Sequence, residues 1–119
     1  MKIAVTSKGP ELDSQIDPRF GRAAYILIVD TSSMNVEVLD NEENLNAFKG
    51  AGIQAASMIS DKSAQVLLTG HCGPNAFKTL AAADIKVIND VNGTVREAVT
   101  AFNEGKLSFA EVSDVEGYW

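Results

Sequence analysis

Cysteine and histidine are nearly absent from this chain, which has one of each, Cys72 and His71. A single cysteine cannot form an internal disulfide, so a disulfide-stapled fold is excluded. One cysteine and one histidine also fall short of the roughly four donors that a structural zinc ion needs. A free thiol is typical of a reducing compartment, and we therefore expect a cytoplasmic protein.

Basic residues are outnumbered as well. The 119 residues include 10 Lys and Arg against 16 Asp and Glu, which gives a formal net charge of -6. Affinity for nucleic acid comes mainly from cations that neutralise phosphates. This balance therefore argues against a nucleic-acid-binding protein.

Long apolar runs are missing too. No span has the length needed to cross a bilayer, which argues against a membrane partner. The strand-like run at residues 1–6 does not have the form of a secretory signal. The apolar content of 45%, with 22% charged residues, is that of an ordinary single globular domain.

Short apolar runs and helical periodicity predict five strands and three helices. Apolar runs without polar alternation, as at 25–29 and 66–68, are typical of strands covered on both faces. The alternation at 36–38 favours an edge strand, and the capping-box spacing of 94–97 marks the start of the last helix. The predicted order is strand 3–5, strand 25–29, strand 36–38, helix 51–59, strand 66–68, helix 77–81, strand 85–88 and helix 95–102.

Strands that alternate with helices require parallel pairing, whereas the first three strands can pair as an antiparallel meander. We predict an α/β domain with a mixed five-stranded sheet and helices on both faces. Two long segments, 7–21 and 40–48, lack periodicity, and such loops usually serve a function or are disordered. If strand 3–5 lies beside strand 66–68, the first loop and the turn at Gly70 share the rim where ligands gather.

The segment 66–76 combines a strand, a glycine-flanked turn and the start of a helix, and it carries both His71 and Cys72. Exposed N–H groups and the helix dipole at such a turn favour an anion or a thiolate. A thiolate is a soft metal donor, and an imidazole can ligate a metal or hydrogen-bond a sulfide. Plain structural roles are the alternative: Cys72 as a small packed hydrophobe, and His71 bonded to a backbone carbonyl.

The first loop carries three cations that an anionic ligand could use: Lys8, Arg19 and Arg22. Arginine suits anions with several acceptor atoms because its donors form a fixed fork. Three carboxylates share the loop: Glu11, Asp13 and Asp17. Salt bridges within the loop are therefore an equal alternative. We expect Phe20 to anchor the loop in the core and Gly21 to mark a position that a side chain would obstruct.

Two segments, Asp17–Ala23 (DPRFGRA) and Thr69–Ala76 (TGHCGPNA), resemble the dinitrogenase iron–molybdenum cofactor biosynthesis family, as does the order of the elements. The similarity covers nearly the whole chain, and the His-Cys turn points to the branch that carries a molybdenum–copper sulfide cluster. The resemblance implies a ribonuclease-H-like sheet, similar to nitrogenase accessory factors. It also implies a carrier that holds a preformed metal–sulfur cluster without catalysing a reaction. The iron–molybdenum cofactor or its precursor is the alternative cargo.

We expect a cluster-binding domain at residues 1–105 and a C-terminal tail at residues 106–119. The candidate cluster-binding residues are Lys8, Arg19, Phe20, Gly21, Arg22, Gly70, His71, Cys72, Gly73 and Asn75. Of these, Cys72 and His71 are the candidate metal ligands.

Two other functions stay open. The segment from Cys72 to Lys78 has the length of a cysteine phosphatase loop, in which N–H groups cradle a thiolate nucleophile. That chemistry needs arginine where this chain has Lys78, and Pro74 removes one N–H donor. The other reading is an interaction module in cluster assembly or cell division. It would use the acidic surface and the aromatic end of the chain, Tyr118 and Trp119.

Overall fold

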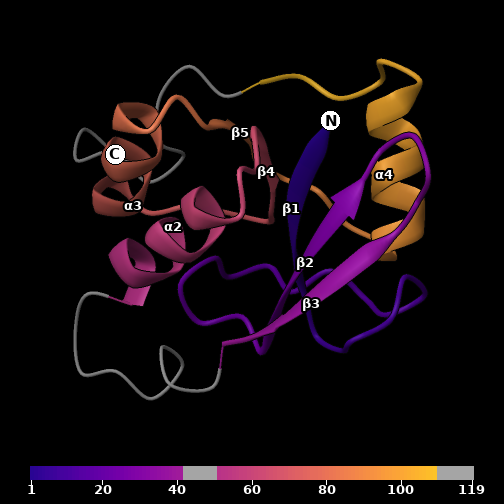
Figure 1. Cartoon of the computed structure of the whole chain (residues 1–119), viewed down its shortest axis with the longest axis horizontal. Coiled ribbons are helices and arrows are strands. Elements are labelled where there is room, and N and C mark those ends of the chain that lie inside the picture. Colours follow the sequence, from indigo (N-terminus) through magenta and orange to yellow (C-terminus); the bar gives the residue numbers. More distant parts are fainter. Residues whose placement is uncertain (42–50, 110–119) are drawn as a thin grey trace.

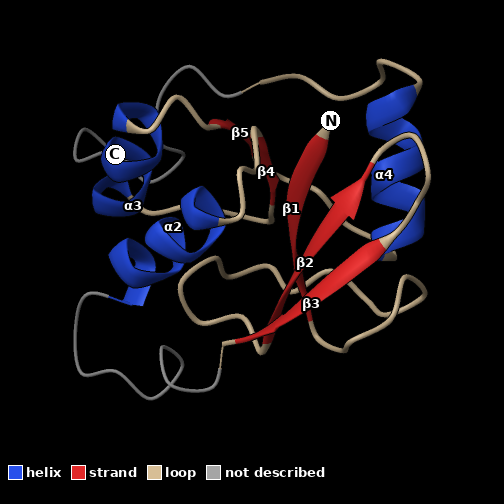
Figure 2. Ribbon diagram, viewed as in Figure 1, coloured by secondary structure: helices blue, strands red, loops and turns tan. Residues whose placement is uncertain are grey.

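The computed structural model describes residues 1–41 and 51–109. Figures 1 and 2 show a twisted sheet with helices packed against it. The elements in chain order are β1 (Lys2–Ser7), β2 (Tyr25–Asp30), β3 (Val36–Asp40), α2 (Ala51–Asp61), β4 (Val66–Leu68), α3 (Pro74–Ala82), β5 (Lys86–Ile88) and α4 (Val95–Asn103). Each predicted strand and helix is present, with small differences at the ends. No helix in the two described ranges is long and apolar enough to cross a membrane.

The strand order in the sheet is β3-β2-β1-β4-β5. β1 pairs antiparallel with β2, and β2 pairs antiparallel with β3, as expected for a meander. β1 pairs in parallel with β4, and β4 with β5, because the crossovers through α2 and α3 return the chain to the same end of the sheet. The predicted mixed five-stranded sheet is confirmed, with β3 at one edge.

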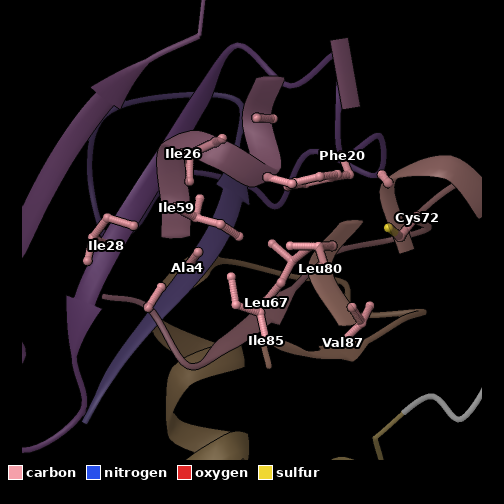
Figure 3. Close-up of a cluster of buried hydrophobic side chains, with 14 residues drawn as sticks. Ala4, Phe20, Ile26, Ile28, Ile59, Leu67, Cys72, Leu80, Ile85 and Val87 are labelled. Carbon is pink, nitrogen blue, oxygen red and sulfur yellow. The ribbon is translucent and has the colours of Figure 1, made fainter. Parts of the chain in front are cut away.

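Helices cover both faces of the sheet, α2 and α3 on one face and α4 on the other (Figure 1). Side chains alternate along β1, so Ala4 belongs to the buried cluster beneath α2 and α3, whereas Ile3 belongs to the cluster beneath α4. Figure 3 shows the first cluster, in which Ile59 of α2 and Leu80 of α3 lie over Leu67 of β4. This burial from two sides explains why the central strands are apolar throughout.

α4 begins with the predicted capping box. Thr94 Oγ1 accepts a hydrogen bond from the Glu97 N–H at 3.1 Å, and the Thr94 N–H donates to Glu97 Oε1 at 2.9 Å. These two bonds satisfy N–H groups that would otherwise lack partners at the helix start. Val95, Ala98 and Val99 then form the buried stripe of the helix.

The first loop, residues 8–24, joins β1 to β2 and is fastened at two places. Toward α4, the Ile16 N–H donates to Gly93 O and the Val95 N–H donates to Ser14 O, both at 2.9 Å. At its other end the loop meets the turn between β4 and α3. The loop has no long regular element, as predicted, but main-chain hydrogen bonds fix its course.

Beyond α4 the described chain continues to residue 109. Leu107 packs against the cluster beneath α4, and the ring of Phe109 meets that of Phe102 edge to face, with centroids 6.5 Å apart. Two of the first four residues of the predicted tail, Leu107 and Phe109, therefore contact the rest of the fold. Residues 110–119, including Tyr118 and Trp119, lie outside the described residues, as does most of the predicted loop at 40–48.

Candidate functional site

The first loop and the turn after β4 lie side by side and are joined by main-chain hydrogen bonds. The His71 N–H donates to Pro18 O at 2.8 Å, and the Phe20 N–H donates to His71 O at 3.3 Å. Together these bonds form a short parallel bridge between Arg19 and His71. The expectation that the two segments share one rim is confirmed, because β1 and β4 are parallel neighbours and end at the same edge.

Gly70 makes this close approach possible. A Cβ atom at this position would lie 2.5 Å from Pro18 Cα and 2.6 Å from Pro18 O. Both are backbone atoms, which cannot move aside without shifting the first loop. Glycine at position 70 thus sets the spacing between the two segments. Gly73, three residues later, has nothing within 4 Å of its Cβ position.

A pocket of about 420 Å³ opens where the two segments meet the first turns of α2 and α3. Its volume falls within the range of about 300–1,000 Å³ that is usual for small-ligand sites. The residues that line it are Arg19, Phe20, Gly21, Arg22, Gly52, His71, Gly73, Pro74, Asn75 and Ala76. The two helices touch beside it, since a Cβ at Gly52 would lie 2.9 Å from Ala76 Cβ.

The charge of this lining is opposite to that of the whole protein. Arg19 and Arg22 contribute to it, and no carboxylate lines the pocket among the residues that the structure describes. The Arg19 side chain is 57% exposed, so its guanidinium is accessible to a ligand. A protein with a net charge of -6 therefore presents a local cationic surface at this rim.

The starts of two helices add to this positive potential. α3 begins at Pro74 after Gly73, a residue with no side chain to cap the free N–H groups. Neither α2 nor α3 has an acidic residue in its first turn to offset the dipole. Each helix N-terminus carries about half a positive charge, and its N–H groups point outward. The pocket therefore has the features of an anion site.

Seven of the predicted site residues line the pocket: Arg19, Phe20, Gly21, Arg22, His71, Gly73 and Asn75. Phe20 is only 2% exposed and belongs to the cluster beneath α2 and α3, so it is the predicted anchor as well. Gly70 does not line the pocket, but it permits the close approach of the two segments that form it. Lys8 lies at the start of the loop, where its N–H donates to Gln15 O at 2.9 Å, and it does not line the pocket.

Cys72 does not line the pocket either. Its side chain is fully buried and belongs to the same cluster as Phe20, Ala76 and Leu80. Figure 3 shows Cys72 and Phe20 at one end of this cluster. The structure thus places the thiol in the packed position that we considered as the alternative. Its role as a metal ligand stays a prediction, as does that of His71, whose side chain is exposed at the rim.

Sequence reasoning missed three lining residues. Gly52, Pro74 and Ala76 line the pocket because the first turns of α2 and α3 meet there, which no local sequence motif predicts.

The salt bridge that we considered as an alternative role for the loop arginines is present for Arg19. Its partner is Asp17, which is only 2% exposed. Its Oδ1 accepts hydrogen bonds from the Arg19 N–H at 3.1 Å and from Arg19 Nε at 3.4 Å.

Metal-ligand clusters are absent from the described part of the chain, in which no three His, Cys, Asp or Glu side chains come together as a metal site.

Comparison with known proteins finds relatives that cover most of the chain. Residues 1–105 match the family described as dinitrogenase iron-molybdenum cofactor. The apo form of the orange protein from Desulfovibrio gigas is 46% identical, with 96% of each chain covered and a TM-score of 0.93. A NifB-like protein from Thermotoga is 39% identical, with 98% of each chain covered and a TM-score of 0.83.

A more distant relative from Methanocaldococcus jannaschii, itself without an assigned function, is 28% identical over 110 residues, or 90% of this chain and 89% of the relative. The match to the family spans the sheet, both rim segments and all three described helices. This chain belongs to the dinitrogenase iron–molybdenum cofactor family, and its similarity to the orange protein extends over nearly its full length.

Proposed function

We propose that this protein is a non-catalytic carrier of an anionic metal–sulfur cluster, which it holds in the pocket between the first loop and the turn after β4. The observation that carries the proposal is the cationic lining of that pocket in an acidic protein. Membership of a cofactor-biosynthesis family supports the same role. A molybdenum–copper sulfide cluster is the cargo that the sequence resemblance favours, with the iron–molybdenum cofactor or its precursor as the alternative.

Electrostatics explains why a multiply charged anion would fit. Arg19 and Arg22 each supply a positive charge, of which the Asp17 carboxylate, 3.4 Å from Arg19 Nε, offsets part. The starts of α2 and α3 add about half a charge each. Arginine forks can donate two hydrogen bonds at once to neighbouring sulfur or oxygen atoms. His71 at the rim can donate a further bond or bind a metal at the edge of the cluster.

Anaerobic reconstitution tests the proposal. Apo-protein mixed with tetrathiomolybdate and copper(I), then passed through a desalting column, is expected to retain molybdenum, copper and a visible charge-transfer absorption. The double variant Arg19→Gln/Arg22→Gln is expected to lose the colour while keeping its fold by circular dichroism. Arg96→Gln removes the same kind of charge from α4, outside the pocket, and should retain it. A colourless wild-type protein, or equal retention by all three proteins, would contradict the proposal.

The phosphatase alternative receives little support from the buried thiol. A nucleophile must reach its substrate, whereas Cys72 is fully buried and its Sγ lies 3.7 Å from Gly73 O. Turnover of a phosphate monoester by the wild-type protein, lost in Cys72→Ser, would favour that function.

Three further assignments belong to the proposal. We propose a cytoplasmic location, because a carrier with a single free cysteine suits a reducing compartment. We also retain the ribonuclease-H-like classification of the sheet, which its mixed pairing permits. Protein partners in cluster assembly or cell division remain a prediction, since the aromatic end at Tyr118 and Trp119 lies outside the described residues.

A further inference from the structure

A buried carboxylate beside a pocket for anions needs an explanation. Asp17 is 2% exposed, and its negative charge lies next to Arg19, one of the two arginines of the pocket. By charge alone, this carboxylate would repel an anionic cargo and weaken its binding. Asp17 is also held firmly: its N–H donates to Thr6 O at 3.0 Å, and its carbonyl oxygen accepts from Thr6 Oγ1 at 2.6 Å.

The anchoring continues into the sheet. Thr6 is the next-to-last residue of β1, and its Oγ1 also lies within hydrogen-bond distance of Thr69 Oγ1, at 3.0 Å. Thr69 directly follows β4 and is fully buried. The backbone of Asp17 is therefore tied to the ends of two neighbouring parallel strands, which form the rigid part of the rim.

The carboxylate faces three donors from its own loop. Oδ1 accepts from both the main-chain N–H and the side-chain Nε of Arg19, while Oδ2 accepts from the Ala24 N–H at 3.4 Å. Oδ1 thus accepts from both the backbone and the guanidinium of Arg19. Oδ2 connects Asp17, in the middle of the loop, to Ala24 at its end.

From this geometry we propose that Asp17 is a positioning residue, which holds the Arg19 guanidinium through Nε so that its two Nη groups are presented to the cargo. The inference rests on the proposed function. An Nε bond uses one edge donor of the guanidinium and leaves the terminal donors for a ligand. A side chain that is already oriented loses less conformational freedom when it binds, and this favours the bound state.

The positioning role and a purely electrostatic role predict opposite signs. Asp17→Ala removes both the charge and the acceptor oxygens, whereas Asn would keep an amide oxygen that can still accept from Arg19 Nε. If Asp17 acts only as a nearby negative charge, Asp17→Ala should raise cluster affinity. If Asp17 positions Arg19, the same substitution should lower affinity by about 10-fold, the lower end of the loss seen when the outer partner of a metal-binding side chain is removed. The direction of the change therefore separates the two explanations.

A double-mutant cycle tests the proposal. The dissociation constant for the cluster formed from tetrathiomolybdate and copper(I) is measured by absorbance titration for wild type, Asp17→Ala, Arg19→Gln and the double variant. We expect Asp17→Ala to weaken binding in the wild-type background and to change it less than about 3-fold when Arg19 is already Gln. Asp13→Ala is the matched control, because Asp13 accepts from Arg96 Nε at 2.8 Å in a pair outside the pocket. It should leave cluster affinity unchanged.

Each outcome has a definite meaning. Equal losses in both backgrounds would show that Asp17 acts on the loop independently of Arg19 and would overturn the inference. A gain or no change in Asp17→Ala would overturn it too, although the carrier function would stand. Failure of the wild-type protein to bind the cluster would overturn both. If Asp17→Ala fails to fold, the Arg19 Nε–H signal in the ¹H–¹⁵N spectrum of the wild-type protein is the deciding measurement. A signal that exchanges with water as fast as that of a free arginine would refute the hydrogen bond.

Discussion

Replacing Gly70 by alanine is the most informative perturbation of the rim. The added Cβ would lie 2.5 Å from Pro18 Cα, and its two nearest contacts are backbone atoms. Inserting a methyl group into a packed site typically costs about 1–3 kcal/mol. The two hydrogen bonds that join the segments contribute about 1 kcal/mol each and would be stretched. Alanine recovers about 0.4–1 kcal/mol by restricting the unfolded chain, which leaves a net loss of about 2–4 kcal/mol.

A loss of this size is measurable by urea denaturation followed by circular dichroism. It corresponds to a fall in Tm on the order of 10 °C for a chain of this length. Gly73→Ala is the matched control from the same turn, because its Cβ would meet nothing within 4 Å and its φ of -65° suits any residue. We expect Gly73→Ala to change stability by less than about 1 kcal/mol. Equal stability of the two variants would refute the argument that Gly70 sets the spacing of the segments.

Three other substitutions test separate parts of the account. Arg96 lowers the pKa of Asp13 by a hydrogen bond and by its charge, so this pair stabilises the fold above the usual carboxyl pKa, and the gain is lost as pH falls through the lowered value. Urea midpoints of wild type and Asp13→Asn should therefore converge in acid, and a constant difference would count against the pair. Cys72→Ala should cost about 1 kcal/mol by removing buried volume and should keep the cargo, whereas a folded variant that loses the cluster would identify a ligand. Thr94→Ala should lower stability by about 0.5–2 kcal/mol in thermal melts by removing the cap of α4, and an unchanged Tm would contradict the capping box.

The sheet could be predicted because its strands carry strong local signals. Continuous apolar runs at 25–29 and 66–68 indicated strands covered on both faces, and both strands lie in the middle of the sheet. Helices between the later strands required parallel pairing, but this did not decide which strand lies beside β4. The sequence placed the first loop and the turn at Gly70 on one rim only on the condition that β1 is that neighbour, and the structure meets this condition.

Side-chain directions within the rim could not be predicted. A turn residue has no periodicity, so the sequence did not reveal whether Cys72 faces the ligand or the core, and packing against Leu80 decides it. Lys8 lies in the right loop, but the hydrogen bond of its N–H to Gln15 O belongs to a part of the loop that does not reach the pocket. The burial of Asp17 depends on Thr6 and the strand ends, which are contacts between distant parts of the chain.

The central claim is that the cationic pocket holds the anionic cluster, and an NMR titration locates the bound cargo directly. The ¹H–¹⁵N spectrum of the protein is recorded anaerobically as tetrathiomolybdate and copper(I) are added. The account predicts that the amide signals of Gly21, Gly52 and Asn75 shift with saturation, while those of Gly93 and Gly105, beside α4, stay in place. Shifts centred on α4, or spread evenly without saturation, would contradict it.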